Sequence, residues 1–338
     1  MKIICISPSF NDGGGTVNVD KLLKLLTKKL GHKVTFVSLQ AVGLSFYSSN
    51  IKLVNVDLSR LSVISSFSVI RLCLRERPSV LISNGRGGAV YSVILGCFVR
   101  KIIVIPRGFQ PYLLLDRVYS KLLALFFSKK TLIIPVGDAE KNRINSCVGN
   151  KIPTRVIRNP VKNLRERAMP RDLPIIWVGR LTFEKRFDDL KRLMGCMSRQ
   201  YIIYTSGQLD NFNHANSQIF NNQRFTEHLR VAGIFVSFSE REGFPTAVVE
   251  ALLMGNAVIL SNIDAHREIA KKPLLFEIGD TERCQTIIKR LEVLHYHGRL
   301  TTVMKRYIKI DKEIFNDELY EKAWRSVLKD HVQNCNFR

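Results

Sequence analysis

The feature that most restricts the fold of this chain is a regular alternation of short apolar strands with helical segments. Residues 2–6, 80–83 and 102–105 are mostly apolar segments of strand length, and each is followed by a glycine-containing turn and a helical pattern. Strands that alternate with helices in this way favour a mostly parallel sheet with helices on both faces. The sequence therefore predicts an α/β fold.

The alternation resumes after a break at 159–160, so a second unit of the same kind is expected. A chain of 338 residues is long enough for two domains of ordinary size. We predict an N-terminal Rossmann-like domain over 1–165, a second Rossmann-like domain over 166–305 and a helical tail over 306–338. Residues 206–224 show little apolar periodicity and are expected to form a long loop.

The cysteines and the apolar runs bear on the cellular compartment. Seven cysteines are scattered singly, which argues against a zinc site or a disulfide scaffold and for a reducing compartment. The opening apolar stretch is too short for a signal peptide, and the apolar run over 89–106 is interrupted by Arg100 and Lys101. These features predict a cytoplasmic protein without a membrane-spanning helix.

Positive charge is concentrated in the first half of the chain. The net charge is +23, and residues 1–163 carry 25 basic and 7 acidic residues, a net of +18. An anionic partner facing this half, either a nucleic acid or an anionic membrane surface, would explain the imbalance. Solubility, or a basic composition without functional meaning, explains it equally well.

Two carboxylates, Glu242 and Glu250, flank a predicted turn and the start of a predicted helix. The apolar run 231–238 precedes them and predicts a buried strand. Between them lie the residues of the turn and of a helix cap: Gly243, Phe244, Pro245 and Thr246. A carboxylate in such a loop can accept hydrogen bonds from sugar hydroxyls, and the helix N-terminus beside it offers N–H groups to an anion. The stretch therefore suits a sugar joined to a phosphate, although a solvated charge pair is the simpler interpretation of two carboxylates alone.

A second stretch, from Gly179 to Arg186, follows the apolar strand 173–178. Gly179 allows the backbone to turn closely after the strand. Arg180 and Lys185 then place two cations near the loop and the start of the next helix, and both side chains suit contact with a phosphate. Two exposed basic residues could also arise by chance in so basic a chain.

Together the two stretches resemble the signature of retaining glycosyltransferases with the GT-B fold, most closely family 4 (group 1), of the bacterial surface-polysaccharide type. The Gly-Arg-Leu-x-x-Glu-Lys pattern from Gly179 is similar to the family motif that grips the donor diphosphate. The segment from Glu242 to Glu250 resembles the family's Glu-x7-Glu motif. The resemblance is clearest over 173–280, and it implies two similar domains around a cleft.

The resemblance implies retaining transfer of a hexosyl-type sugar from a nucleotide-diphosphate sugar to a glycan. Arg180 and Lys185 would neutralise the diphosphate as it gains charge, which is electrostatic stabilisation of the transition state. Glu242 would contact sugar hydroxyls, and Glu250 would contact the nucleotide ribose. No cofactor and no essential metal are implied beside the nucleotide-sugar co-substrate, and the sequence contains no Asp-x-Asp metal motif.

Further candidate residues follow other strands. Gly14 and Gly15 look like the family's Gly-Gly loop, which lies under the donor phosphates and near the acceptor. Arg86 is a candidate for contact with the acceptor or a phosphate, and a flexible turn explains its glycine-rich loop equally well. Arg107 stands where many relatives carry histidine, so any histidine contact to the sugar is in doubt, and Arg107 itself becomes an acceptor-side candidate. For His266 we expect a structural role.

Residues 111–130 contain more apolar residues than one core-facing stripe needs, and basic residues flank them. Such a helix suits a membrane interface, although a core helix is the more common interpretation. In the family the first domain receives the acceptor. With the charge of that domain, the segment predicts a lipid-linked glycan acceptor at the inner face of the cytoplasmic membrane, as in lipopolysaccharide, O-antigen or capsule biosynthesis. Glycosylation of a small molecule is the competing hypothesis.

Two other classes of function share some of these features with a transferase. The charge suggests a nucleic-acid-binding protein, but the sequence contains no helix-turn-helix, zinc-finger or aromatic–basic motif, so we expect no nucleic-acid partner. A non-catalytic subunit that binds a nucleotide sugar would carry the same motifs as an enzyme. Turnover with a panel of donors distinguishes those two.

Overall fold

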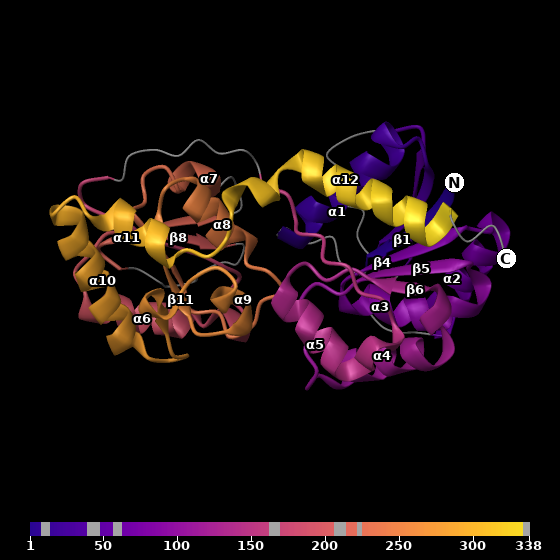
Figure 1. Cartoon of the computed structure of the whole chain (residues 1–338), viewed down its shortest axis with the longest axis horizontal. Coiled ribbons are helices and arrows are strands. Elements are labelled where there is room, and N and C mark those ends of the chain that lie inside the picture. The colour runs from indigo at the N-terminus through magenta and orange to yellow at the C-terminus, as the bar shows by residue number, and fades with distance from the viewer. Residues whose placement is uncertain are drawn as a thin grey trace. The chain divides into compact units, whose positions relative to one another are not determined.

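The computed structural model describes residues 1–7, 14–38, 48–56, 63–161, 170–205, 214–221 and 225–333. The chain divides into two compact units, which are Met1–Pro160 together with Asp317–Arg338, and Val161–Asn316 (Figure 1). The boundary predicted between residues 165 and 166 lies outside the described residues. Within the described residues each unit contains one six-stranded sheet, and all its strand pairs are parallel.

The first unit is built on a sheet with the strand order β3-β2-β1-β4-β5-β6. Its strands are β1 (Lys2–Ser7), β2 (Lys33–Ser38), β3 (Ile51–Asn55), β4 (Val80–Asn84), β5 (Lys101–Ile105) and β6 (Thr131–Ile133). In the central pairing Cys5 lies opposite Phe36 on one side and Ile82 on the other. Strand β4 begins with three apolar residues, and all five of its residues, Ser83 and Asn84 included, are buried, so the strand shows no alternation of buried and exposed positions.

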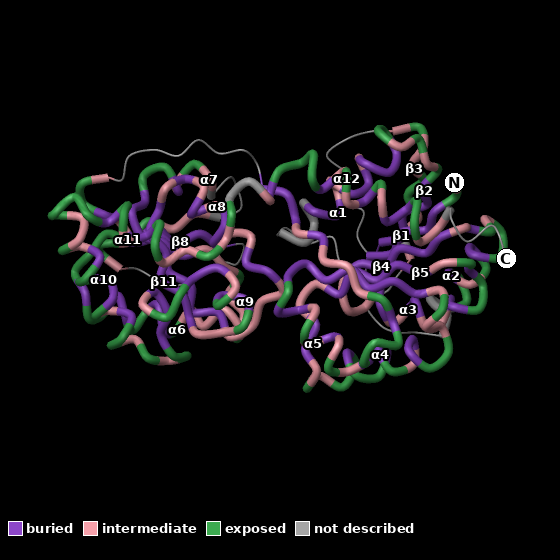
Figure 2. The backbone as a smooth tube through the Cα atoms, viewed as in Figure 1, coloured by how far each residue is buried: buried purple, intermediate pink, exposed green. Residues whose placement is uncertain are grey.

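The helices of the first unit cover both faces of this sheet. They are α1 (Gly14–Lys24) with the π-helical turn η1 (Leu25–Lys29), α2 (Val63–Glu76), α3 (Gly85–Ile94), the 3₁₀ turn η2 (Gly96–Phe98), α4 (Leu114–Phe126), the 3₁₀ turn η3 (Ser128–Lys130), α5 (Asp138–Val148) and α12 (Asp317–Val327). Figure 1 shows α1 and α12 on one side of the sheet and α3, α4 and α5 on the other. The buried positions follow the strands and the inward sides of the helices (Figure 2).

The second unit repeats this topology with the strand order β12-β11-β10-β7-β8-β9. Its strands are β7 (Ile175–Val178), β8 (Tyr201–Thr205), β9 (Ser217–Asn221), β10 (Ile234–Ser237), β11 (Ala257–Ser261) and β12 (Leu275–Phe276). Numbered along each unit, both sheets have the order 3-2-1-4-5-6 of the doubly wound fold. The prediction of a loop over 206–224 was wrong at β9, which is a half-exposed edge strand paired with β8.

The helices of the second unit are short except for one. They are α6 (Phe187–Cys196), α7 (Phe225–His228), α8 (Thr246–Leu253), α9 (Asp264–Arg267), α10 (Thr281–Tyr296) and α11 (Leu300–Tyr307). Asp280 caps α10 by accepting a hydrogen bond of 2.8 Å from the backbone N–H of Arg283. None of the described helices is both long enough and apolar enough to cross a membrane.

The helical tail that the sequence predicts over 306–338 is not one continuous helix. Helix α11 ends at Tyr307, where Ile308 forms an antiparallel bridge with Ala270. Helix α12 begins at Asp317 and belongs to the first unit, where Tyr320 and Trp324 are buried. The apolar periodicity runs through both helices, so the sequence showed no break between them.

In each sheet the strand order reverses at one place, between β1 and β4 in the first unit and between β7 and β10 in the second. Open α/β sheets bind ligands beyond the carboxyl ends of their strands at this switch point. The loops that follow these four strands are therefore the first place to look for a functional site.

Candidate functional site

The two sequence motifs of the second unit meet at its switch point. Strands β7 and β10 are parallel neighbours, with Ile175 opposite Ile234. The loop that follows β7 and the loop that follows β10 therefore begin side by side. The backbone N–H of Glu240 donates a hydrogen bond of 2.8 Å to the carbonyl oxygen of Glu184, which joins the two loops directly.

Gly179 turns the chain where the backbone runs close to a large side chain. A Cβ atom at this position would lie 2.8 Å from the ring of Trp177, closer than real Cβ contacts come. The backbone N–H of Gly179 donates to the carbonyl oxygen of Tyr204 at 3.0 Å. A 3₁₀ turn over Phe183–Lys185 follows, and Arg186 then adopts the left-handed conformation with φ +50°. The turn brings Lys185 back towards the strand edge, since its Cγ would lie 3.4 Å from a Cβ of Gly179.

Ion pairs between the loops bring the predicted site residues together. The ammonium of Lys185 pairs with the carboxylate of Glu242, and both side chains are about four-fifths buried. Arg186 pairs with Asp189 on its own helix and with Glu240 on the neighbouring loop. Arg180 differs, because its side chain is 59% exposed and its guanidinium is 3.7 Å from Glu184. The structure therefore joins Lys185 to Glu242 and leaves Arg180 at the surface.

The Lys185 ammonium determines the charge state of Glu242. Burial raises the pKa of the Glu242 carboxyl, and the positive charge and hydrogen bond of Lys185 lower it by more, so the net shift is downward. A hydrogen bond from Ser239 adds to the lowering. Glu242 is therefore a carboxylate at neutral pH and can accept hydrogen bonds from hydroxyl groups.

Glu242 is connected to a row of buried polar groups that the sequence did not indicate. His266, on α9, is fully buried, and its Nδ1 is 2.8 Å from the carbonyl oxygen of Ser261. The hydroxyl of Ser261 donates to the carbonyl oxygen of Ser239 at 2.5 Å, and Ser239 bonds to Glu242. Burial lowers the pKa of His266 to about 4 against the raising effect of Glu242, so this imidazole is neutral at physiological pH. The bond between Ser261 and Ser239 forms only when β10 pairs with β11, so no local sequence pattern indicates this row of buried polar groups.

The stretch between the two carboxylates has the placement that was predicted, with one correction. Glu242 lies in the loop after β10, and Glu250 lies half-buried on α8. Thr246 is the first residue of α8 rather than its cap, because Pro245 occupies the cap position and no side chain caps the helix. Phe244 is buried, and its ring stacks on Phe315 with centroids 5.5 Å apart. The turn is thus held by packing, and Gly243 before it is half-buried.

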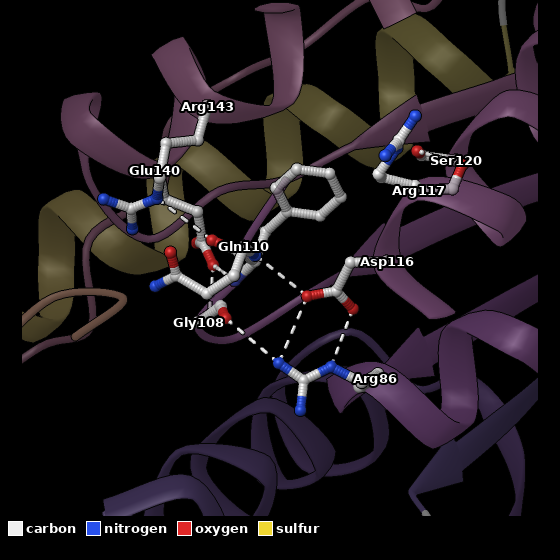
Figure 3. A network of polar contacts seen from close by, with 9 residues as sticks. Arg86, Gly108, Gln110, Asp116, Arg117, Ser120, Glu140 and Arg143 are labelled. Atoms are coloured by element: carbon white, nitrogen blue, oxygen red, sulfur yellow. Dashed lines mark hydrogen bonds and ion pairs between the residues drawn. The ribbon is translucent and has the colours of Figure 1, made fainter. Parts of the chain in front are cut away.

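In the first unit Arg86 is engaged with a buried carboxylate. Its Nε and Nη2 donate to the two oxygens of Asp116 at 2.7 and 3.1 Å, which is a bidentate pair (Figure 3). Asp116 is 1% exposed in its side chain and also accepts from the backbone N–H of Gln110 at 2.8 Å. Arg86 therefore fixes the loop after β5 to α4 in this structure, and its contact with an acceptor stays a prediction.

A second buried carboxylate holds the same loop from the other side. Glu140, on α5, accepts hydrogen bonds from the backbone N–H groups of Gly108 and Phe109 (Figure 3). It also accepts one from the backbone N–H of Val136, which follows β6. The guanidinium of Arg143 donates to the carbonyl oxygen of Phe109 at 3.0 Å. Buried backbone N–H groups need such partners, and this network supplies them to the loop after β5.

Arg107 lies at the carboxyl end of β5 in the left-handed conformation, with φ +53°. Its guanidinium donates to the side-chain oxygens of Asn84 and Asn159, and Asn84 in turn donates to Ser7 at 3.1 Å. Burial lowers the pKa of Arg107 from its ordinary value. Arg107 therefore ties together the ends of β1, β4 and β5, and its role towards an acceptor remains untested.

The other predicted residues of the first unit are Gly14 and Gly15. They form the start of α1, and residues 8–13 before them lie outside the described residues. Among the described residues, no group of three or more histidine, cysteine, aspartate or glutamate side chains could hold a metal ion.

Solved structures share the architecture over the whole chain. Sucrose-phosphate synthase from Thermosynechococcus elongatus superposes with a TM-score of 0.79 at 14% identity, covering 98% of this chain and 99% of that one. Anabaena HepE in complex with UDP and glucose has a TM-score of 0.74 at 14% identity, with 97% and 99% covered. The lipopolysaccharide outer core galactosyltransferase WaaB has a TM-score of 0.68 at 16% identity, with 97% and 99% covered. The fold of this protein is GT-B, as the sequence predicts.

The match to a sequence family covers less of the chain than the structural matches do. Residues 173–292 match the family model described as glycosyl transferases group 1. No curated protein matches the chain. The matched segment contains both motifs of the candidate site, so the fold and the family match together support a group 1 glycosyltransferase.

Proposed function

We propose that this protein is a retaining glycosyltransferase of family 4 type that transfers a hexosyl-type sugar from a nucleotide-diphosphate sugar to a lipid-linked glycan. The observation that carries the proposal is the Lys185–Glu242 pair at the switch point of the second sheet. Each partner comes from one of the two motifs, and both lie within the segment that matches the group 1 family model. A cation for a diphosphate and a carboxylate for hydroxyl groups are thus adjacent.

The chemistry assigned to these residues follows from their charge and burial. When the bond between the anomeric carbon and the phosphate oxygen breaks, negative charge grows on the departing diphosphate. An ammonium has three N–H donors, so Lys185 can keep Glu242 while it donates to a phosphate oxygen. The exposed Arg180 supplies a second cation that can turn towards the diphosphate when the donor binds.

The two carboxylates take different parts of the donor. Glu242 is a fixed carboxylate and would accept hydrogen bonds from the hydroxyls of the transferred sugar. Glu250, on α8, would contact the ribose of the nucleotide. Retention at the anomeric carbon would follow from attack on the same face that the diphosphate leaves.

The ligands and pathways of similar structures support the choice of donor and acceptor class. HepE has been solved with UDP and with UDP-glucose, which makes uridine donors the first to test. WaaB and WaaG are described as acting in the lipopolysaccharide core and in lipopolysaccharide biosynthesis. Together with the +18 charge of residues 1–163, this favours a lipid-linked acceptor of the lipopolysaccharide, O-antigen or capsule kind.

Calorimetry with UDP and with UDP-sugars tests the division of roles between the carboxylates. Glu250→Ala should weaken binding of free UDP, because its partner is the ribose. Glu242→Ala should leave UDP binding unchanged and remove sugar transfer. The control is Glu282→Ala, an exposed carboxylate on α10, which should change neither. Equal losses of UDP affinity in the Glu242 and Glu250 variants would contradict the assignment.

We expect the transfer to need no metal ion and no cofactor. Arg180 and Lys185 supply the positive charge that a metal would otherwise place on the diphosphate. Transfer should therefore proceed at an unchanged rate after dialysis against a chelator. A rate that collapses in the chelator and returns with added magnesium or manganese would show that these two cations are not sufficient.

A further inference from the structure

The row of buried polar groups connected to Glu242 lies within the apolar core of the second unit. Its members are Ser239, which follows β10, Ser261, which ends β11, and His266 on α9, and each is at most 3% exposed. Their neighbours along the chain, Phe238 and Leu260, are buried apolar residues. A buried hydroxyl or imidazole costs free energy unless hydrogen bonds replace the water that it has lost. Three such groups in a row therefore call for a reason beyond the packing of the sheet.

The imidazole of His266 is held through one of its two nitrogens. Its Nδ1 donates to the carbonyl oxygen of Ser261 at 2.8 Å, and this oxygen also accepts from the backbone N–H of Ile263 at 2.9 Å. A carbonyl oxygen only accepts, so the proton lies on Nδ1 and Nε2 carries a lone pair. Among the described residues no hydrogen-bond partner reaches Nε2, which is buried. The ring is therefore fixed in one tautomer.

The hydroxyl of Ser261 joins the imidazole to the loop that carries Glu242. It donates to the carbonyl oxygen of Ser239 at 2.5 Å, and its oxygen is 3.1 Å from Nδ1 of His266. The hydroxyl of Ser239 in turn bonds to the Glu242 carboxylate. Since Lys185, from the loop after β7, pairs with the same carboxylate, groups from two loops hold Glu242 in place.

A second hydrogen-bond partner matters for a carboxylate that reads hydroxyl groups. A glutamate side chain has several rotatable bonds, so a carboxylate held by the ammonium alone could turn about that contact. Hydrogen bonds weaken steeply as they bend, so a fixed carboxylate accepts a hydroxyl from one direction only. A site built to bond one hydroxyl discriminates strongly against a sugar that places this hydroxyl elsewhere.

We propose that His266 and Ser261 are positioning residues that fix the Glu242 carboxylate and thereby set the discrimination between donor sugars that differ at one hydroxyl. Both are fully buried, so they act on the donor only through Ser239 and Glu242. The inference rests on the proposed function, in which Glu242 contacts the hydroxyls of the transferred sugar.

Kinetics with two pairs of epimeric donors test the proposal. The pairs are UDP-glucose with UDP-galactose, and UDP-N-acetylglucosamine with UDP-N-acetylgalactosamine, and within each pair one hydroxyl changes its orientation. Wild type should turn over one donor of a pair faster than the other. Ser261→Ala should lower kcat/KM for the preferred donor about tenfold and for its epimer by less, because the hydroxyl contact is weakened only where it is made. Binding of free UDP should be unchanged.

The two variants of His266 distinguish positioning from packing. His266→Asn keeps an N–H donor at the place of Nδ1, so it should keep the wild-type ratio of kcat/KM between the epimers. His266→Leu fills similar space without a donor and should lower this ratio as Ser261→Ala does. In both His266 variants the Ser261 carbonyl keeps its bond from the backbone of Ile263, so it is not left unpaired.

The matched control is Asn256→Ala, which removes buried hydrogen bonds from the amino end of β11 instead of its carboxyl end. Asn256 is 3% exposed, and its Nδ2 donates to the carbonyl oxygens of Leu229 and Ala251 at 3.0 and 3.2 Å. Its loss should lower the melting temperature at least as much as Ser261→Ala does and should leave the epimer ratio unchanged. Thermal denaturation measures the first effect, and the same kinetics measure the second.

Three results would overturn the proposal while leaving the transferase intact. They are a wild-type epimer ratio that survives in both Ser261→Ala and His266→Leu, a fall of the same size in Asn256→Ala, and a wild type that turns over both epimers equally. The second result would assign the effect to stability alone. Absence of turnover of any nucleotide sugar by the wild type would instead reject the transferase, and this inference with it.

Discussion

At the residue scale, Lys185 serves both the stability of the second unit and the chemistry proposed for it. Its partner Glu242 is about four-fifths buried, so a variant that removes the ammonium leaves a buried carboxylate without its counter-charge. Arg180 lies at the surface with only a loose contact to Glu184. Substitution of the two cations should therefore affect stability differently, although both are proposed to contact the donor.

Lys185→Ala should lower the free energy of unfolding by about 1–3 kcal/mol, the usual effect of leaving a buried polar group unpaired. Arg180→Ala should change it by less than about 0.5 kcal/mol, as is usual at an exposed site. Both should reduce turnover by at least about tenfold through the lost phosphate contact. Urea denaturation and steady-state kinetics measure the two effects. Equal stability of the two variants would show that the Lys185–Glu242 pair does not hold the loops.

The neutral His266 should give the protein a characteristic dependence of stability on pH. Its pKa is about 4 in the folded state and 6.5 ordinarily, so between these values the unfolded chain binds a proton that the folded chain does not. Stability should therefore rise with pH over this window, by about 3 kcal/mol from this group alone. Below about pH 4 the contribution becomes constant, because both states are then protonated.

His266→Asn should flatten this slope, because an asparagine amide can donate to the Ser261 carbonyl but does not titrate. Thermal denaturation from pH 4 to 7 measures it. His297→Gln, at an exposed position of the same unit, is the control and should keep the wild-type slope. If His266→Asn and wild type lose the same stability on acidification, then groups other than His266 cause the loss of stability at low pH.

At the scale of single elements, the turn after β7 depends on a glycine that has no room for a side chain. Gly179→Ala places a Cβ against the Trp177 ring, which is itself packed on Phe187, and should cost about 1–3 kcal/mol of stability. Gly195→Ala is the matched control, since a Cβ there meets nothing within 4 Å and alanine favours the helix by about 0.5–1 kcal/mol. Chemical denaturation should therefore give opposite signs, and two changes of the same sign would contradict the packing argument.

The elements that could be predicted from sequence are those that bury apolar residues in a regular order. Central strands such as β4 and β10 each begin with three consecutive apolar residues and are buried throughout, so the strands and their parallel arrangement were predictable. Strand β9 is a half-exposed edge, where little apolar surface is buried and no run forms. The break between α11 and α12 contains neither glycine nor proline, so nothing local indicated it.

In the candidate site, too, some residues could be predicted from the sequence and others could not. Gly179, Lys185, Glu242 and Glu250 lie in local motifs whose residue order fixes their place on loop or helix. The chain from His266 through Ser261 to Ser239 depends on the pairing of β10 with β11, which no local pattern shows. Asp116 on α4 and Glu140 on α5, which hold the loop after β5, were missed because their partners Arg86 and Phe109 lie 30 and 31 residues away in sequence.

At the scale of the whole molecule, the chain ends in the unit where it began, because α12 is part of the first unit. A chain that ends at Asn316 should lose the stability of the first unit and keep that of the second, since Tyr320 and Trp324 are removed from a buried position. Removal of Trp324 leaves Trp177 as the one tryptophan, a reporter of the second unit. In the shortened chain, the thermal unfolding transition seen by Trp177 fluorescence should match that of full-length Trp324→Phe. Circular dichroism should show a further transition at lower temperature, from the first unit. A shifted Trp177 transition would show that the second unit does not unfold independently of α12.

The central claim is that the second unit binds a nucleotide-diphosphate sugar and activates its diphosphate as a leaving group. The most direct measurement is release of nucleoside diphosphate from a panel of nucleotide sugars by the full-length protein, with a glycolipid extract as acceptor. We predict that one donor is turned over and that Arg180→Ala lowers its kcat/KM about ten- to a hundredfold, while the exposed control Glu282→Ala keeps it. No turnover of any donor, or wild-type turnover in Arg180→Ala and Lys185→Ala, would contradict the account.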